Sequence, residues 1–215
     1  KRNLLRYLPI VLVILCIHGG CSMADKDLNP MEQKVFDVSD QDNPLNYTQM
    51  LGEVSRRYKQ TPQTMDDLMD RIAFHETGPG SRMNPETIQS GGGPGRGLFQ
   101  FETGEGQGGM TAMRRLRQYF KDSGGEIPGW TDYNPREGLD ASKLTPQQQK
   151  MLFMANTMYH PTASLEGVNP DNLGEYWQKY HYAGPEDKRD LFNESMAAYN
   201  LKYTPTAEEE AFGEY

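Results

Sequence analysis

Hydrophobic residues recur at helical spacing between residues 62 and 77 and predict a helix with one buried face. The stripe consists of Met65, Leu68, Met69, Ile72 and Ala73. Intervals of three and four residues are those of an amphipathic helix. Thr61 and Pro62 supply an N-cap and a first-turn proline. Glu76 follows Ile72 by four residues, so we expect its carboxyl group to point the same way as the buried face.

Five further segments show a helical pattern of hydrophobic positions. Helices are predicted over residues 45–59, from Met110 to Phe120, behind the capping box Thr145-Pro146-Gln147-Gln148, after Asn169-Pro170 and from Pro185 onward. Between them, residues 78–109 are rich in glycine and proline, which excludes a long helix there. Loops with one small hairpin near residues 87–101 are expected in that segment. The fold class predicted is mostly α-helical with a Gly-rich loop or small β-hairpin region.

The N-terminus has the pattern of a targeting or membrane segment. Basic residues precede an apolar run from Tyr7 to Ile17, which has the length of a signal-peptide core, about 7–15 residues, rather than the ~20 of a membrane span. Ser22-Met23-Ala24 offers a cleavage site, and Cys21 after two glycines loosely resembles a lipoprotein box. A cleaved signal, a lipoprotein signal and a retained anchor all remain open, and each takes the chain across or onto a membrane.

Composition divides the chain into four parts. Residues 1–24 are the leader, and residues 25–60 are a polar linker followed by an N-terminal helix. Residues 61–203 are the main domain, and residues 204–215 are an acidic tail. The net charge of -8 argues against nucleic-acid binding, because phosphate contacts need a surplus of Lys and Arg. Both cysteines lie in the first 21 residues, so the main domain has neither a disulfide nor a thiolate metal site.

Glu76 is the strongest candidate for chemistry. A carboxyl group on a buried face loses hydration, which favours its protonated form, and a protonated carboxyl group can act as a general acid. Cleavage of a glycosidic bond needs such an acid, because the leaving oxygen must be protonated as positive charge builds on the sugar ring. Gly97-Leu98-Phe99-Gln100 supplies a tight turn and an amide for hydrogen bonds to a sugar. Faces for sugar stacking are offered by Trp130, Tyr133, Trp177, Tyr180 and Tyr182.

Two motifs carry a resemblance to a known family. Phe74-His75-Glu76-Thr77-Gly78, followed by Gly97-Leu98-Phe99-Gln100-Phe101, resembles the soluble lytic transglycosylase and goose-type lysozyme superfamily and the lysozyme-like domains of phage virions. In that family a Gly-Leu-Met-Gln-like motif follows the catalytic glutamate by twenty-odd residues, and here the interval is 100 − 76 = 24. Thr77 stands where the family usually has serine, and Phe99 where it has methionine.

The family also has an Ala-Tyr-Asn-Ala-Gly-Pro-like motif, whose tyrosine lies near the glutamate. Tyr182-Ala183-Gly184-Pro185 resembles the end of this motif, and Ala197-Ala198-Tyr199-Asn200 resembles its beginning. The resemblance therefore leaves either Tyr182 or Tyr199 as the residue that orients Glu76.

The resemblance spans roughly residues 62–203 and implies a lysozyme-like helical fold. It implies cleavage of the β-1,4 bond between N-acetylmuramic acid and N-acetylglucosamine in peptidoglycan, with Glu76 as acid and then base. Gly97, Leu98 and Gln100 would position the glycan. The expected partners are glycan strands, a membrane through the N-terminus and other virion proteins, and no cofactor or metal is expected. The expected location is the virion or host cell envelope, or alternatively a bacterial outer membrane.

Several alternatives accompany this interpretation. Hydrolysis needs a second carboxylate, for which the candidates are Glu86, Glu102, Glu105 and Asp132. The anhydro-forming route of lytic transglycosylases needs only one, and it is favoured because a single carboxyl group carries a motif. A non-catalytic virion or envelope protein that binds glycan through the same fold is the alternative function. His75-Glu76 begins a zinc-protease pattern, but Pro79 stands where the second histidine is required.

Overall fold

The computed structural model describes residues 44–78, 83–104, 108–132, 134, 136–182 and 184–203. The chain divides into two compact units, residues 1–39 and 40–215, and every described residue belongs to the second. The predicted leader, most of the predicted linker and the acidic tail lie outside the described residues. No helix among the described residues combines the length and the apolar character needed to cross a membrane.

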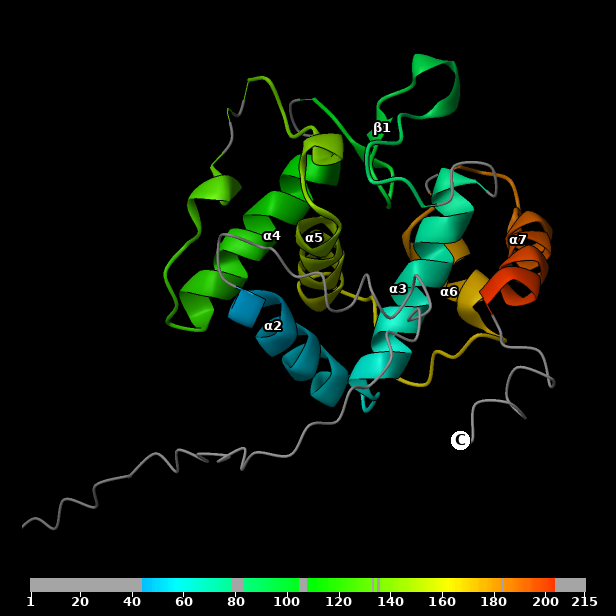
Figure 1. The fold of residues 1–215 in the computed structure, drawn as a ribbon, viewed down its shortest axis with the longest axis horizontal. Helices are drawn as coiled ribbons and strands as arrows, with labels where there is room; N and C mark the ends of the chain where they lie inside the picture. The colour runs from blue at the N-terminus through cyan, green and yellow to red at the C-terminus, as the bar shows by residue number, and fades with distance from the viewer. Residues whose placement is uncertain are drawn as a thin grey trace, which may run out of the picture. The chain divides into compact units, whose positions relative to one another are not determined.

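The described residues form a mostly α-helical domain of six helices with a small two-stranded antiparallel sheet (Figure 1). The helices are α2 (Pro44–Arg57), α3 (Pro62–Thr77), α4 (Gly108–Asp122), α5 (Pro146–Met158), α6 (Leu173–Tyr180) and α7 (Arg189–Tyr203). Single 3-10 turns occur at η1 (Ser90–Gly92), η2 (Gly129–Thr131) and η3 (Ala141–Lys143). The predicted mostly helical class is confirmed.

One hydrophobic core joins these helices. All five residues of the apolar stripe on α3 are buried in it, as their spacing predicts. Helix α3 packs against α2 and α7, while α5 packs against α2 and α4. Helix α2, which the sequence groups with the linker, places Met50, Val54 and Tyr58 in the same core.

The predicted start signals of two helices are confirmed in atomic detail. The Thr61 hydroxyl accepts a hydrogen bond from the backbone N–H of Thr64 at 3.0 Å. Thr145 and Gln148 form a reciprocal capping box at the start of α5. Each cap satisfies backbone N–H groups that have no partner within the first turn of a helix.

Two predicted helix starts are wrong by a few residues. Helix α6 begins at Leu173 rather than directly after Asn169-Pro170, because the Asn169 carboxamide accepts from the backbone N–H of Asp171 and holds a turn. Helix α7 begins at Arg189 rather than at Pro185, and the Asp187 carboxylate accepts from the backbone N–H of Arg189. Short polar side chains that bond to nearby backbone compete with helix formation in this way.

The predicted hairpin is present at the C-terminal end of α3 (Figure 1). Strand β1 (Gly95–Arg96) pairs antiparallel with β2 (Phe101–Glu102), with Arg96 opposite Phe101. Ile88 forms an additional antiparallel bridge to Arg96. The turn between β1 and β2 is Gly97-Leu98-Phe99-Gln100, so the hairpin presents the second motif at its tip.

A largely buried ionic cluster fastens α5 to α3. The Lys150 ammonium lies 2.7 Å from Asp66 Oδ1 and 2.9 Å from Asp70 Oδ1, and the Tyr47 hydroxyl donates to Asp66. Only 12% of the Lys150 side chain is exposed. Burial alone lowers the pKa of Lys150, but the negative charge of Asp70 and its neighbours outweighs burial and raises this pKa, so the ammonium stays charged.

We predict that Lys150→Met lowers the free energy of unfolding by about 3 kcal/mol, because it leaves two largely buried carboxylates without their cation. Urea denaturation at pH 7 measures the loss. Lys143→Met is the matched control, since Lys143 is 80% exposed and 3.7 Å from Asp140, and it should cost less than about 1 kcal/mol. Equal losses in the two variants would contradict the prediction.

Candidate functional site

Glu76 occupies the last turn of α3, which ends at Thr77. Its side chain is largely buried, with 16% exposed. The Thr77 hydroxyl donates back to the carbonyl oxygen of Ala73 at 2.7 Å, so this hydroxyl stabilises the end of the helix. The carboxyl group therefore sits at a helix end with limited contact with water.

Two nitrogen atoms approach a single oxygen of Glu76. The indole Nε1–H of Trp177, on α6, donates to Oε1 at 2.5 Å. His181, directly after α6, places its Nε2 at 3.5 Å from the same oxygen. Within the described residues, these are the polar contacts of the carboxyl group, and the one from Trp177 is a hydrogen bond.

His181 also joins Glu76 to the hairpin turn. Its Nε2 lies 2.9 Å from the backbone carbonyl oxygen of Phe99. A carbonyl oxygen only accepts hydrogen bonds, so Nε2 must carry the hydrogen. Residues 76, 99 and 181 thus meet at one imidazole, which brings the two sequence motifs together in space.

Gln149 on α5 holds this turn in place through hydrogen bonds of its side chain. This side chain is fully buried. It accepts from the backbone N–H of Leu98 at 2.6 Å and donates to the carbonyl oxygens of Pro85 and Leu144. Gln149 therefore fixes the position of the turn relative to α5.

The predicted glycan-contacting residues of the turn have unequal access. Gly97 and Leu98 are buried, and their backbone N–H groups bond to Thr87 and Gln149. Gln100 is half-buried and has a positive φ of 47°. Its Nε2 donates to the carbonyl oxygen of Gly97 at 2.7 Å. Gly97 and Leu98 thus shape the turn, and Gln100 is the residue of this group that reaches the surface.

The two candidate tyrosines lie in different places. Tyr182 stacks on the indole of Trp177 with ring centroids 5.1 Å apart, and therefore lies next to the partner of Glu76. The Tyr199 hydroxyl is 3.3 Å from Asp67, and the Arg71 guanidinium lies over its ring. Asp67 precedes Glu76 by nine residues, about 13 Å along a helix. Tyr182 thus stacks on the residue that bonds Glu76, whereas Tyr199 packs on Phe74 and lies by Asp67.

Those of the other predicted aromatic and acidic residues that the structure describes have no hydrogen bond or ion pair to Glu76. Trp130 is half-buried in η2, Tyr180 packs on Tyr176, and Tyr133 lies outside the described residues. Asp132 pairs with Arg117, and Glu86 and Glu102 are exposed. Glu105 lies outside the described residues.

Three contributors to the site were not identified from sequence as partners of Glu76 or of its turn. Trp177 was a candidate sugar platform, yet it is buried and donates to Glu76. Gln149 carried no sequence signal beyond its place in the first turns of a helix. The spacing of the family motif points to His181. This residue stands two positions before Ala183-Gly184-Pro185, and the tyrosine of the motif stands two positions before its Ala-Gly-Pro.

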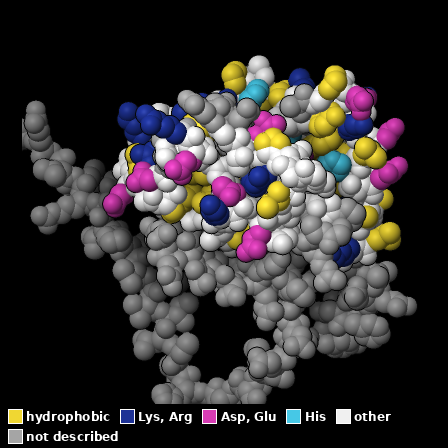
Figure 2. All heavy atoms as spheres, turned by 90° about the horizontal axis from the view of Figure 1, so that it is seen from above, with side chains coloured by type: hydrophobic (Ala, Val, Ile, Leu, Met, Phe, Trp, Pro, Cys, Tyr) yellow, Lys and Arg dark blue, Asp and Glu magenta, His cyan; other side chains and the backbone are white. Residues whose placement is uncertain are grey.

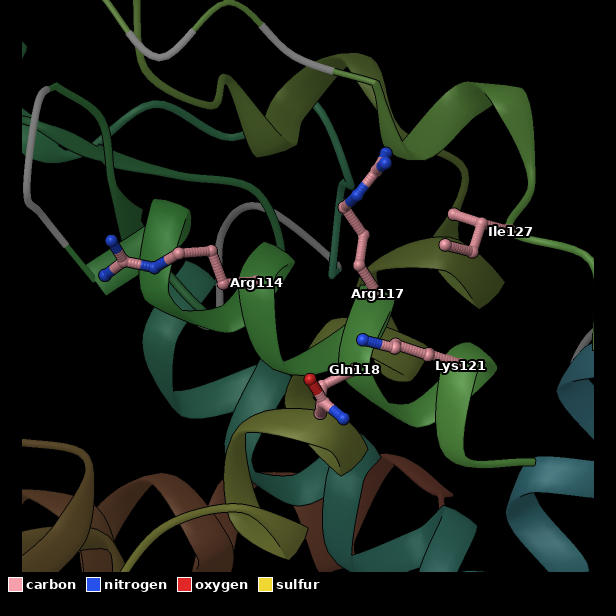
Figure 3. A pocket seen from close by; sticks show the side chains of 5 residues that line it. All are labelled: Arg114, Arg117, Gln118, Lys121 and Ile127. Atoms are coloured by element: carbon pink, nitrogen blue, oxygen red, sulfur yellow. The ribbon is translucent and has the colours of Figure 1, made fainter. Parts of the chain in front are cut away.

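A separate hollow lies on the outer side of α4. Its volume is about 370 Å³, and it is lined by Arg114, Arg117, Gln118, Lys121 and Ile127 (Figure 3). Arg117 is already paired with Asp132 at 2.6 Å, which reduces the positive charge available there. Figure 2 shows one group of Lys and Arg side chains at an edge of the face, while other Lys and Arg side chains are interspersed with hydrophobic, acidic and histidine side chains. This hollow does not include Glu76.

Comparison with protein-family models, with curated proteins and with solved structures finds no match for this chain.

We predict that Gly97→Ala destabilises the protein by about 2–3 kcal/mol. Gly97 has a φ of 76°, and an added Cβ would lie 2.2 Å from Gln149 Oε1, so the substitution strains the backbone and displaces a buried amide. Thermal and urea denaturation measure the effect. Gly129→Ala is the control, because its Cβ would meet nothing within 4 Å. A Gly97→Ala variant as stable as this control would contradict the predicted role of the turn.

His75, beside Glu76, is neutral and packed. Its ring lies against Trp177 and Phe192, and its Nδ1 is 3.0 Å from the Ser195 hydroxyl. That hydroxyl donates to the carbonyl oxygen of Leu191, so it accepts from His75 Nδ1–H. Burial, with a smaller contribution from His181, lowers the pKa of His75 from 6.5 to about 4.

We predict that His75 makes the protein less stable as the pH falls from about 6.5 to about 4. In that window the unfolded chain takes up a proton on this residue, whereas the folded chain does not, so acid favours unfolding. His75→Phe keeps a ring between Trp177 and Phe192 and removes the titration. The stability of the wild type minus that of the variant should fall by about 2 kcal/mol between pH 7 and pH 4. A pH-independent difference in urea denaturation would contradict this.

Proposed function

We propose that this protein is a peptidoglycan-cleaving glycosidase with a lysozyme-like fold, acting as a lytic transglycosylase. The single observation that carries the proposal is the meeting of the Glu76 carboxyl group, the Gly97–Gln100 turn and His181 at one place. The acid required for glycosidic cleavage is largely buried but still partly exposed, which fits a group that must reach a substrate.

The sequence resemblance supports the same function. When Ala183-Gly184-Pro185 is aligned with the end of the Ala-Tyr-Asn-Ala-Gly-Pro-like motif, the motif's tyrosine falls on His181. His181 lies beside the glutamate, where the resemblance implies a tyrosine. Its imidazole N–H bonds the Phe99 carbonyl oxygen of the turn, so His181 links the turn to the neighbourhood of the glutamate.

The proposed reaction uses Glu76 twice. Protonated Glu76 gives its proton to the oxygen of the β-1,4 bond between N-acetylmuramic acid and N-acetylglucosamine, and the C1–O4 bond breaks. The resulting carboxylate then takes the proton of the 6-hydroxyl group, whose oxygen attacks C1 and closes a 1,6-anhydro ring. Glu76 ends protonated, so no second carboxylate and no cofactor is required. Gln100 and Tyr182 are the residues proposed to contact the glycan beside it.

The proposed setting is the bacterial cell envelope or a phage virion that opens the wall for genome entry. This part of the proposal rests on the basic and apolar N-terminal sequence, which lies outside the described residues, and on the phage resemblance. An outer-membrane lipoprotein is the alternative setting.

We predict that Glu76→Gln lowers the rate of peptidoglycan solubilisation by at least about 100-fold, because the amide cannot donate the proton. The amide keeps an oxygen for Trp177 and should leave the fold intact. The measurement is release of soluble fragments from purified peptidoglycan by the full chain, with mass spectrometry of the products. Fragments lighter than hydrolytic ones by one water are expected.

Glu175→Gln is the matched control, because Glu175 is exposed on the same helix as Trp177 and should leave the rate unchanged. Ordinary reducing ends would replace the transglycosylase route by hydrolysis. Binding to peptidoglycan without fragments, unaffected by Glu76→Gln, would favour the non-catalytic glycan-binding protein instead.

A further inference from the structure

We infer that Trp177 is a positioning residue that holds Oε1 of Glu76, so that Oε2 is the oxygen that carries and delivers the proton. This inference rests on the proposed function, because it assigns the two carboxyl oxygens of the same acid. It follows from where the indole N–H lies and from the chemistry of a carboxyl group.

One nitrogen donates to this oxygen, and a second lies near it. Trp177 Nε1 lies 2.5 Å from Oε1, and His181 Nε2 lies 3.5 Å from it. The indole nitrogen only donates, whereas the single hydrogen on His181 Nε2 is given to the carbonyl oxygen of Phe99. No bond to Oε2 occurs among the described residues, which leaves this oxygen for a substrate.

The chemistry of a protonated carboxyl group then fixes which oxygen carries the proton. Such a group has one carbonyl oxygen, which accepts, and one hydroxyl oxygen, which donates. The oxygen that faces the indole N–H of Trp177 must be the acceptor, because an O–H there would leave a buried donor opposed by another donor. Oε1 is thus the carbonyl oxygen of the acid, and it can keep its hydrogen bond when the group ionises.

Packing makes this arrangement rigid. Trp177 is 4% exposed, and its indole contacts Tyr182, His75 and Phe192. His181 is held by the carbonyl oxygen of Phe99. A group held in one rotamer loses little freedom when the substrate binds, which is the condition for efficient proton transfer.

The titratable neighbours of Glu76 are few within the described residues. His75 precedes it on α3, and its low pKa keeps it neutral above about pH 5. His181 faces Glu76, and Tyr182 stacks on Trp177 after α6. On the hairpin, the Arg96 guanidinium bonds to the carbonyl oxygens of Gly93 and Gly95, and Glu102 is exposed.

The test is the pH dependence of peptidoglycan cleavage by Trp177→Phe, which removes the N–H but keeps an aromatic ring. A general acid loses activity as the pH rises and it ionises, and an N–H donor to the carboxylate favours ionisation. We predict that the variant keeps its activity to a higher pH than the wild type. Its kcat should fall about tenfold with an unchanged KM, because the carboxyl group is less well oriented.

Two controls separate positioning from a merely structural role. Tyr176→Phe also removes one hydrogen bond of a buried aromatic side chain on α6, to Thr157, and should leave the profile unmoved. His181→Gln keeps a side-chain N–H donor without a titrating ring and should retain most of the activity, whereas His181→Phe should not. A Trp177→Phe variant whose activity falls by the same factor at every pH, or does not fall at all, would overturn the inference.

A second measurement does not depend on activity. The chain has two tryptophans, so a ¹⁵N-labelled sample has two indole N–H signals, which Trp130→Phe assigns. His75 also contacts Trp177 and has a pKa of about 4, so the spectra are compared in a His75→Phe background. There, the pH dependence that a carboxyl group imposes on the Trp177 signal should disappear in Glu76→Gln. A Trp177 signal that titrates identically in both proteins overturns the inference. Loss of the titration in a protein that cleaves no peptidoglycan would instead contradict the proposed function alone.

Discussion

The hydrogen bond from His181 to the carbonyl oxygen of Phe99 is the interaction on which the candidate site depends. It fixes the hairpin turn relative to the end of α6, and the same imidazole faces Glu76 at the end of α3. The hairpin turn, the end of α6 and the end of α3 therefore meet around the His181 imidazole, although they lie far apart in the sequence. Gln149 holds the same turn from α5, so the turn is fixed from two sides and its geometry is set before any ligand arrives.

Local patterns in the sequence were sufficient for most of the helical fold. The stripe from Met65 to Ala73 and the caps at Thr61 and Thr145 depend on residues within one or two turns, and the structure confirms them. The starts of α6 and α7 were misplaced because Pro170 and Pro185 looked like first-turn prolines. Asn169 and Asp187 instead bond to nearby backbone N–H groups and delay the helix.

The site was harder to predict, because its contacts span long stretches of sequence. Glu76 and the turn could be named from short motifs, but Trp177 lies 101 residues beyond Glu76 and His181 lies 82 residues beyond Phe99. No local periodicity distinguishes a tryptophan that packs from one that also donates a hydrogen bond to a carboxyl group. Gln149 was equally hard to predict, since a glutamine in the first turns of a helix is ordinarily solvated. Its amide is buried and bonded because the hairpin packs over it.

The arrangement around Glu76 reconciles two demands that one residue must meet if it acts as acid and then as base. The acid form needs an acceptor oxygen and a free hydroxyl, and the carboxylate needs donors that stabilise its charge. The indole N–H on Oε1 would serve the carbonyl oxygen of the first form and the charged oxygen of the second. Because Trp177 is held by its packing, it would not have to move as a proton left Oε2. Under the proposed function, proton transfer in both directions would then require no reorganisation of the protein, which is the property expected of a single-carboxylate site.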